Sequence, residues 1–126
     1  MADLNTEKIL MTDFCNGSQH DFQLFKNSRC AISQATCLLA DAGYQGLLAL
    51  HPNSQTPTKK SKLHPVSQAH KHSNRTLSRK RIFIENIIRR LKIFRILSER
   101  YRNRRKRFGL RFNLIAAICN LELNLL

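Results

Sequence analysis

The sequence lacks the features that mark a secreted, disulfide-bonded or membrane-spanning protein. Its four cysteines form no CxxC pair, so we expect reduced thiols. Asp3, Glu7 and Lys8 lie where a signal peptide would be apolar, so we expect no secretory leader. The C-terminal residues 112–126 are apolar but interrupted by asparagines and a glutamate, so we expect a core helix instead of a membrane span.

Acidic residues are also scarce. The chain has 126 residues with 22 Lys or Arg against 8 Asp or Glu, which gives a formal charge of +14. Between residues 59 and 111 there are 19 bases and two acids, Glu85 and Glu99, whereas residues 1–58 hold three bases and five acids. This asymmetry indicates a polyanionic partner, and it favours nucleic acid over a merely basic protein.

The first half of the chain has short apolar runs separated by turn-forming residues. Residues 8–14 (KILMTDF) indicate a strand, and residues 20–26 (HDFQLFK) indicate a short helix with Ser18 as its N-cap. Residues 36–40 (TCLLA) predict a buried strand, followed by a glycine-containing loop at 41–46. Residues 51–75 contain all three prolines and several lysines, and we expect them to form a flexible basic loop.

From Thr76 the pattern is helical. An apolar stripe at three- and four-residue steps comprises Ile84, Ile87, Ile88, Leu91 and Ile93 or Phe94, extended by Leu97 and Tyr101. The opposite face is basic, with Arg79, Arg81, Arg89, Arg90, Lys92 and Arg95. Residues 100–107 (RYRNRRKR) are a charge run at a helix end. A final helix begins at about Phe108, with an expected buried face of Leu110, Leu114, Ile115, Ala117, Ile118 and Leu121.

Glu85 is the first candidate for chemistry. It is an isolated acid on a basic helix, with Arg81 and Arg89 four residues before and after it. Neighbouring cations favour its ionised form, and a carboxylate beside phosphate-binding cations suits a metal-dependent phosphodiesterase site. On spacing alone, an ordinary salt bridge between residues four apart is the more common arrangement.

Asp41 is the second candidate. It directly follows the apolar run at 36–40 and precedes a glycine, so its carboxylate is expected at the end of a strand, where α/β proteins gather their sites. Taken alone, a turn-forming aspartate beside glycine is again the more common arrangement.

Together these residues carry a family resemblance. The segment DAGYQG (residues 41–46) resembles the second-aspartate motif of DDE transposases of the insertion-sequence-5 and Harbinger-like group. Arg81, Glu85 and Lys92 fit the Arg-x3-Glu-x6-Lys end of that superfamily's signature, although Ser78 stands where its tyrosine would fall. Residues 17–28 and 94–123 resemble the segments that flank these motifs, so the resemblance covers nearly the whole chain, as the C-terminal part of a catalytic domain.

The resemblance implies an α/β, ribonuclease-H-like fold, here incomplete, in which three carboxylates hold two Mg²⁺ or Mn²⁺ ions. It assigns Asp41 and Glu85 as catalytic, metal-binding carboxylates. The residues expected to bind DNA are Arg79, Arg81, Arg89, Lys92, Lys59 and Lys60. The family's first aspartate has no counterpart, because Asp3 and Asp13 lack the required strand context and sequence distance.

These expectations define the working hypothesis. The chain would bind DNA in the bacterial cytoplasm, at the nucleoid, and would not cut DNA unaided. An upstream transposase half or a homo-oligomer would be its protein partner. Two alternatives stay open: a small basic nucleic-acid-binding protein without catalysis, and a basic amphipathic helix on an anionic membrane.

Two further groups are interpreted as structural. His64, His70 and His72 lie close together without acid or cysteine partners, as polar loop residues do. Aromatic residues interleave with the bases, as in nucleic-acid platforms, but at helical spacing they are more often core residues. These are Phe83, Phe94, Tyr101, Phe108 and Phe112.

Overall fold

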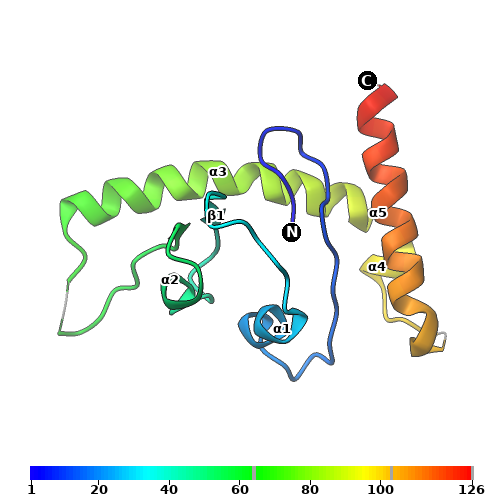
Figure 1. Cartoon of the computed structure of the whole chain (residues 1–126), viewed down its shortest axis with the longest axis horizontal. Coiled ribbons are helices and arrows are strands. Elements are labelled where there is room, and N and C mark those ends of the chain that lie inside the picture. The colour runs from blue at the N-terminus through cyan, green and yellow to red at the C-terminus, as the bar shows by residue number, and fades with distance from the viewer. Residues whose placement is uncertain (64, 103, 126) are drawn as a thin grey trace. The chain divides into compact units, whose positions relative to one another are not determined.

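A computed structural model describes residues 1–63, 65–102 and 104–125. The chain divides into two compact units. One comprises Cys15–Arg79, here called the strand unit; the other comprises Met1–Phe14 and Lys80–Leu126, here called the helical unit. The helices are α1 (Asp21–Ser28), α2 (Leu47–Leu50), α3 (Gln68–Lys92), α4 (Arg95–Ser98), the 3-10 helix η1 (Arg105–Arg107) and α5 (Phe108–Leu125), and the strands are β1 (Leu38–Leu39) and β2 (Ser54–Gln55) (Figure 1).

The expected short helix is present as α1, but its N-cap is different. His20 is extended and its ring Nδ1 accepts a hydrogen bond from the Phe22 amide at 3.2 Å. Ser18 therefore does not cap this helix, and that prediction was wrong. A histidine nitrogen satisfies one of the unpaired amides of the first turn as a serine hydroxyl would.

The strand expected over residues 36–40 is present but reduced to β1. It pairs in parallel with β2, with Leu38 opposite Ser54 and Leu39 opposite Gln55, and α2 lies between the two strands in sequence. Both leucines are only half-buried, so the expectation of a buried strand was wrong. A parallel pair joined through a helix is consistent with an α/β domain.

The expected loop at 51–75 is shorter than the composition indicated. Its start contributes β2, and α3 already begins at Gln68, ahead of Thr76. Two hydrogen bonds of 2.9 and 3.0 Å join the Thr58 backbone to the Asn74 side chain and hold the remaining segment against α3. His70 and His72 are exposed positions of this helix, and His64 lies outside the described residues.

In the helical unit, residues 8–14 form an extended segment that is not a strand of a β-sheet. Ala2 and Ile9 form an isolated antiparallel bridge. The Ile9 amide donates to Asn120 Oδ1 at 2.7 Å, and Asn120 Nδ2 donates to the Ile9 carbonyl at 2.8 Å. The strand prediction was wrong, because the Ile9 backbone is paired by the Asn120 side chain of α5 and residues 8–14 join no sheet.

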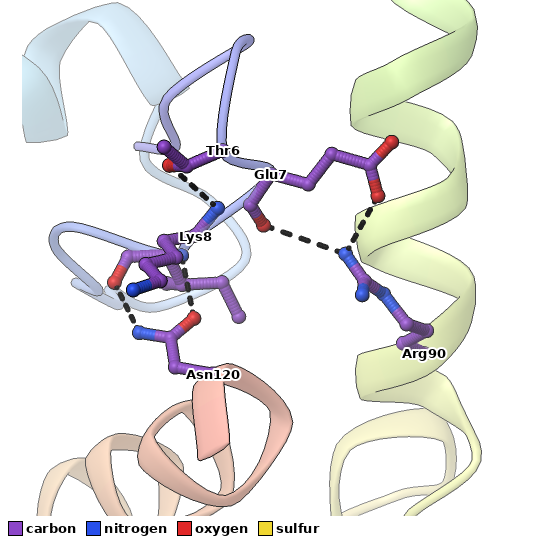
Figure 2. Close-up of polar contacts among 6 residues, drawn as sticks. Thr6, Glu7, Lys8, Arg90 and Asn120 are labelled. Carbon is purple, nitrogen blue, oxygen red and sulfur yellow. Dashed lines mark hydrogen bonds and ion pairs between the residues drawn. The ribbon is translucent and has the colours of Figure 1, made fainter. Parts of the chain in front are cut away.

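The Asn120 side-chain amide and an ion pair of Arg90 hold the N-terminal segment to the helices of this unit. Figure 2 shows Asn120 of α5 and Arg90 of α3 reaching it from different sides. Arg90 Nη2 lies 3.2 Å from Glu7 Oε2 and also donates to the Glu7 carbonyl at 3.4 Å. A hydrogen bond between Thr12 and Asn113 adds a third attachment.

The apolar stripe does not continue to Leu97 and Tyr101 as one helix. Because α3 ends at Lys92 and Phe94 is extended, α4 is a separate short helix. Within α3 only Ile87 is buried, whereas Ile88 and the following Ile93 are exposed.

The final helix is confirmed as α5, but its buried face differs from the expected one. Ile115, Ala116 and Cys119 are buried, and this burial raises the pKa of the Cys119 thiol. Of the expected face only Ile115 is buried, and its other five residues are exposed: Leu110, Leu114, Ala117, Ile118 and Leu121. Because α5 is apolar on nearly every side, its sequence pattern could not identify the face that the rest of the unit covers.

None of the helices in the described residues is long and apolar enough to cross a bilayer.

Candidate metal-binding and DNA-binding site

Asp41 lies just beyond β1, as expected, and forms a local turn. Its Oδ1 accepts a hydrogen bond from the Gly43 amide at 2.8 Å, and the Tyr44 amide donates to the Asp41 carbonyl at 3.1 Å. A methyl group at Gly43 would lie 3.0 Å from that carboxylate oxygen, so the turn leaves little room for a side chain there. The Asp41 carboxylate is exposed to solvent, and its hydrogen bond within the turn fixes its orientation.

Aromatic packing attaches this turn to α1. The Tyr44 ring lies 5.6 Å from Phe22 and 6.2 Å from Phe25, between ring centres. Burial raises the pKa of Tyr44, and the nearby charges of Asp21 and Asp41 raise it further. The segment at 17–28 therefore packs against the motif at 41–46 and supports it. The sequence showed only that one precedes the other in the chain.

Glu85 lies on the exposed basic face of α3. Its Oε1 is 3.4 Å from Arg81 Nε, and both side chains are more than half exposed, at 59% and 62%. This is the ordinary i,i+4 salt bridge that the spacing allowed, and at such exposure it contributes little to stability. Its formation leaves the second carboxylate oxygen of Glu85 open to another ligand.

The α3 face also brings together three of the expected DNA-binding cations. Glu85, Ile88, Arg89 and Lys92 line a shallow depression one to three turns along α3 from Arg81. Arg79, Lys59 and Lys60 are exposed in the strand unit, Arg79 on α3 and the two lysines on the segment that precedes it. All six predicted DNA-binding side chains are thus exposed to solvent.

Arg90 corrects the expected basic face. It pairs with Glu7, and its side chain is 26% exposed. Arg90 is therefore a structural residue of the helical unit. Sequence periodicity could not reveal this, because the partner lies 83 positions away.

The two predicted metal ligands belong to different units: Asp41 to the strand unit and Glu85 to the helical unit. Their approach to a common site stays a prediction. Within the part of the chain that the structure describes, no three His, Cys, Asp or Glu side chains gather to form a metal site.

Comparison with known proteins gives the family. Residues 1–120 match the family model described as "DDE superfamily endonuclease". The chain belongs to the DDE superfamily endonucleases. No solved structure matches it.

A relative from Microchaete diplosiphon, "Probable transposase for insertion sequence element IS702", is 49% identical over 120 residues. The match covers 95% of this chain but 44% of the relative, so the chain spans less than half the relative's length. The transposase resemblance is thereby confirmed.

Proposed function

We propose that this chain contributes Asp41 and Glu85 as two metal-binding carboxylates to the catalytic site of a DDE transposase. In this proposal the domain is ribonuclease-H-like, acts at the bacterial nucleoid, and uses Mg²⁺ or Mn²⁺ in DNA strand cleavage and transfer. The observation that carries it is the family match over residues 1–120, which includes both carboxylates.

The donor chemistry of the two residues fits the proposed ions. Carboxylate oxygens are the preferred protein ligands of Mg²⁺. One oxygen of Asp41 accepts the Gly43 amide and one oxygen of Glu85 faces Arg81, so each carboxylate keeps coordinating capacity while its position is restrained. Both are exposed, so an ion and a DNA strand can reach them.

The cations of α3 have a separate role in the proposal. Arg81 positions Glu85 through their ion pair, while Arg89 and Lys92 neutralise phosphate charge beside it. Arg79, Lys59 and Lys60 extend the DNA contact. When bound, divalent ions would supply polarisation of the scissile phosphate and activation of the attacking oxygen.

We further propose that these 126 residues do not cleave DNA unaided, because a two-metal site requires a third carboxylate. Asp3 and Asp13 are engaged locally. Asp3 accepts hydrogen bonds from the Thr6 hydroxyl and the Asn5 amide, which lower its pKa, and Asp13 accepts one from the Phe14 amide. An upstream transposase half, in the same or another polypeptide, would supply the missing aspartate.

A complementation assay tests this function. The chain is mixed with the part of the Microchaete diplosiphon relative that it does not match, and Mg²⁺-dependent nicking of DNA is measured. Nicking is expected only in the mixture, and Asp41→Asn or Glu85→Gln should abolish it while DNA affinity is retained. Each replacement keeps the shape of the side chain, and the Asp41→Asn amide retains an oxygen that can accept from the Gly43 amide.

Glu99→Gln is the matched control. Glu99 also pairs with an arginine four residues away, Arg95, at 4.0 Å, and it is similarly exposed. This variant should nick DNA at the unaltered rate. Equal losses for Glu85→Gln and Glu99→Gln, or robust nicking by the chain alone, would contradict the assignment.

A further inference from the structure

A cluster of exposed cations lies immediately before α5. Residues 104–107, here called the basic turn, comprise Arg104 and the three residues of η1, and all four are exposed. Like charges at this spacing repel one another, and the positive end of the α5 helix dipole adds to the repulsion. The turn is therefore electrostatically unfavourable in the free chain.

The structure describes three ion pairs in the helical unit. Those pairs join Arg81 to Glu85, Arg90 to Glu7 and Arg95 to Glu99. In the described part of the chain, Arg104, Lys106 and Arg107 take part in none of them. An external anion would offset the unfavourable charge.

The backbone of the turn is nevertheless held in place. The Tyr101 hydroxyl donates to the Arg104 carbonyl at 3.3 Å and accepts from Arg111 Nη1 at 2.6 Å. The Arg107 amide donates to the same Arg104 carbonyl at 3.2 Å. Tyr101 thus connects the start of the basic turn to the first turn of α5.

An aromatic cluster anchors this arrangement to the N-terminal segment. The Phe108 ring packs edge-on against Tyr101 at 4.8 Å and against Phe14 at 4.9 Å, and Phe112 lies 6.0 Å from it. Phe14 also lies so close to Gly109 that an added methyl group would be 2.8 Å from its ring. The cations therefore project from a backbone that packing has already ordered.

We propose that the basic turn is a second phosphate-binding site for duplex DNA, distinct from the α3 face. This inference rests on the proposed function, which supplies DNA as the ligand. Contacts from Arg and Lys to phosphates position a protein on a duplex without reading its sequence. Because the turn is already ordered, binding loses less conformational entropy there than on an unrestrained polycationic segment.

The test compares two triple variants that each remove three positive charges. The first is Arg104→Gln/Lys106→Gln/Arg107→Gln. The control is Lys8→Gln/Lys26→Gln/Arg29→Gln, which removes the bases of the first 58 residues. DNA affinity of the complete chain is measured against salt concentration for both variants and the unaltered protein.

For the basic-turn variant, the slope of log affinity against log salt should fall by about 2.7, because each lost phosphate contact removes about 0.9. At about 0.1 M salt this corresponds to an affinity loss of roughly 500-fold. The control should keep its slope. An unchanged slope for the basic-turn variant, or equal changes in both, would overturn the inference.

Tyr101→Phe tests the role of the ordered backbone without changing the charge. It removes the hydroxyl that joins Arg104 to Arg111 and keeps the ring against Phe108. We expect a several-fold loss of DNA affinity with an unchanged salt slope, while circular dichroism shows that the helices are retained. Unaltered affinity would show that the ordering has no role in binding.

The proposed function and this inference can fail separately. If Arg79→Gln/Arg81→Gln/Arg89→Gln lowers the slope and the basic-turn variant does not, the inference alone is overturned. If the unaltered chain does not bind DNA at low salt, the DNA-binding part of the proposed function is overturned with it.

Discussion

Replacing Asn120 by alanine tests whether a single side chain holds the N-terminal segment to α5. Asn120 makes two hydrogen bonds with the Ile9 backbone, of 2.7 and 2.8 Å, in a partly buried environment (Figure 2). Each such bond contributes about 1 kcal/mol net, so their loss should cost about 2 kcal/mol. Alanine recovers up to about 0.7 kcal/mol of helix propensity, which leaves an expected net loss of roughly 1.5 kcal/mol.

Asn124→Ala is the matched control in the same helix. Asn124 is exposed one turn later, so this change gives the propensity gain without removing a contact to Ile9. Urea unfolding followed by circular dichroism should therefore separate the two variants by about 2 kcal/mol. Hydrogen exchange supplies a local readout, because the Ile9 amide should lose its protection only in Asn120→Ala.

The reasoning would be refuted if the two variants agreed within about 0.5 kcal/mol, since that is less than one hydrogen bond usually contributes. It would also be refuted if the Ile9 amide exchanged at the same rate in both.

Two further predictions concern other parts of the chain. Gly109→Ala should destabilise the helical unit by about 1 kcal/mol, because the overpacking cost of a methyl group 2.8 Å from the Phe14 ring exceeds the gain in helix propensity. Chemical denaturation measures the change in stability. A gain in stability would show that the Phe14 ring moves aside at little cost. Tyr44 should ionise above its ordinary value of 10.0, since burial and then the charges of Asp21 and Asp41 raise its pKa. The contribution of Tyr44 to stability is then complete below pH 10.0 and is lost as the pH rises through the raised pKa. Near-ultraviolet titration of a variant whose other tyrosine is replaced by phenylalanine measures this pKa. A midpoint at or below 10.0 would contradict the prediction.

Local sequence patterns identified the two long helices, although not the ends of α3. The three- and four-residue spacing around Ile87 identified α3, and the apolar residues after Phe108 identified α5. Such periodicity reflects contacts within one or two turns, so it can be detected without knowing the fold. Asp41 at the end of β1 and Glu85 beside Arg81 were also located correctly, because adjacent residues determine both positions.

Elements that depend on distant partners were predicted poorly. Residues 8–14 were expected to be a strand, but the Asn120 amide pairs with Ile9 from 111 positions away. The buried face of α5 was misjudged in the same way, since Leu114 and Leu121 are as apolar as the residues that are covered. Arg90 carries the same charge as its neighbours on α3, and only the position of Glu7 distinguishes it.

The sequence by itself determined the strongly basic character, the two long helices and the transposase motifs that lead to the DDE superfamily. Charge, helical periodicity and motif order are properties of residues close together in the chain, and they persist in any conformation that keeps local structure. Only the tertiary structure decided which apolar face is covered, which arginine is structural, and how Tyr101 and its neighbouring rings order the basic turn. Those outcomes depend on side chains that meet after the chain has folded back on itself, and their separation in sequence leaves no local pattern to detect.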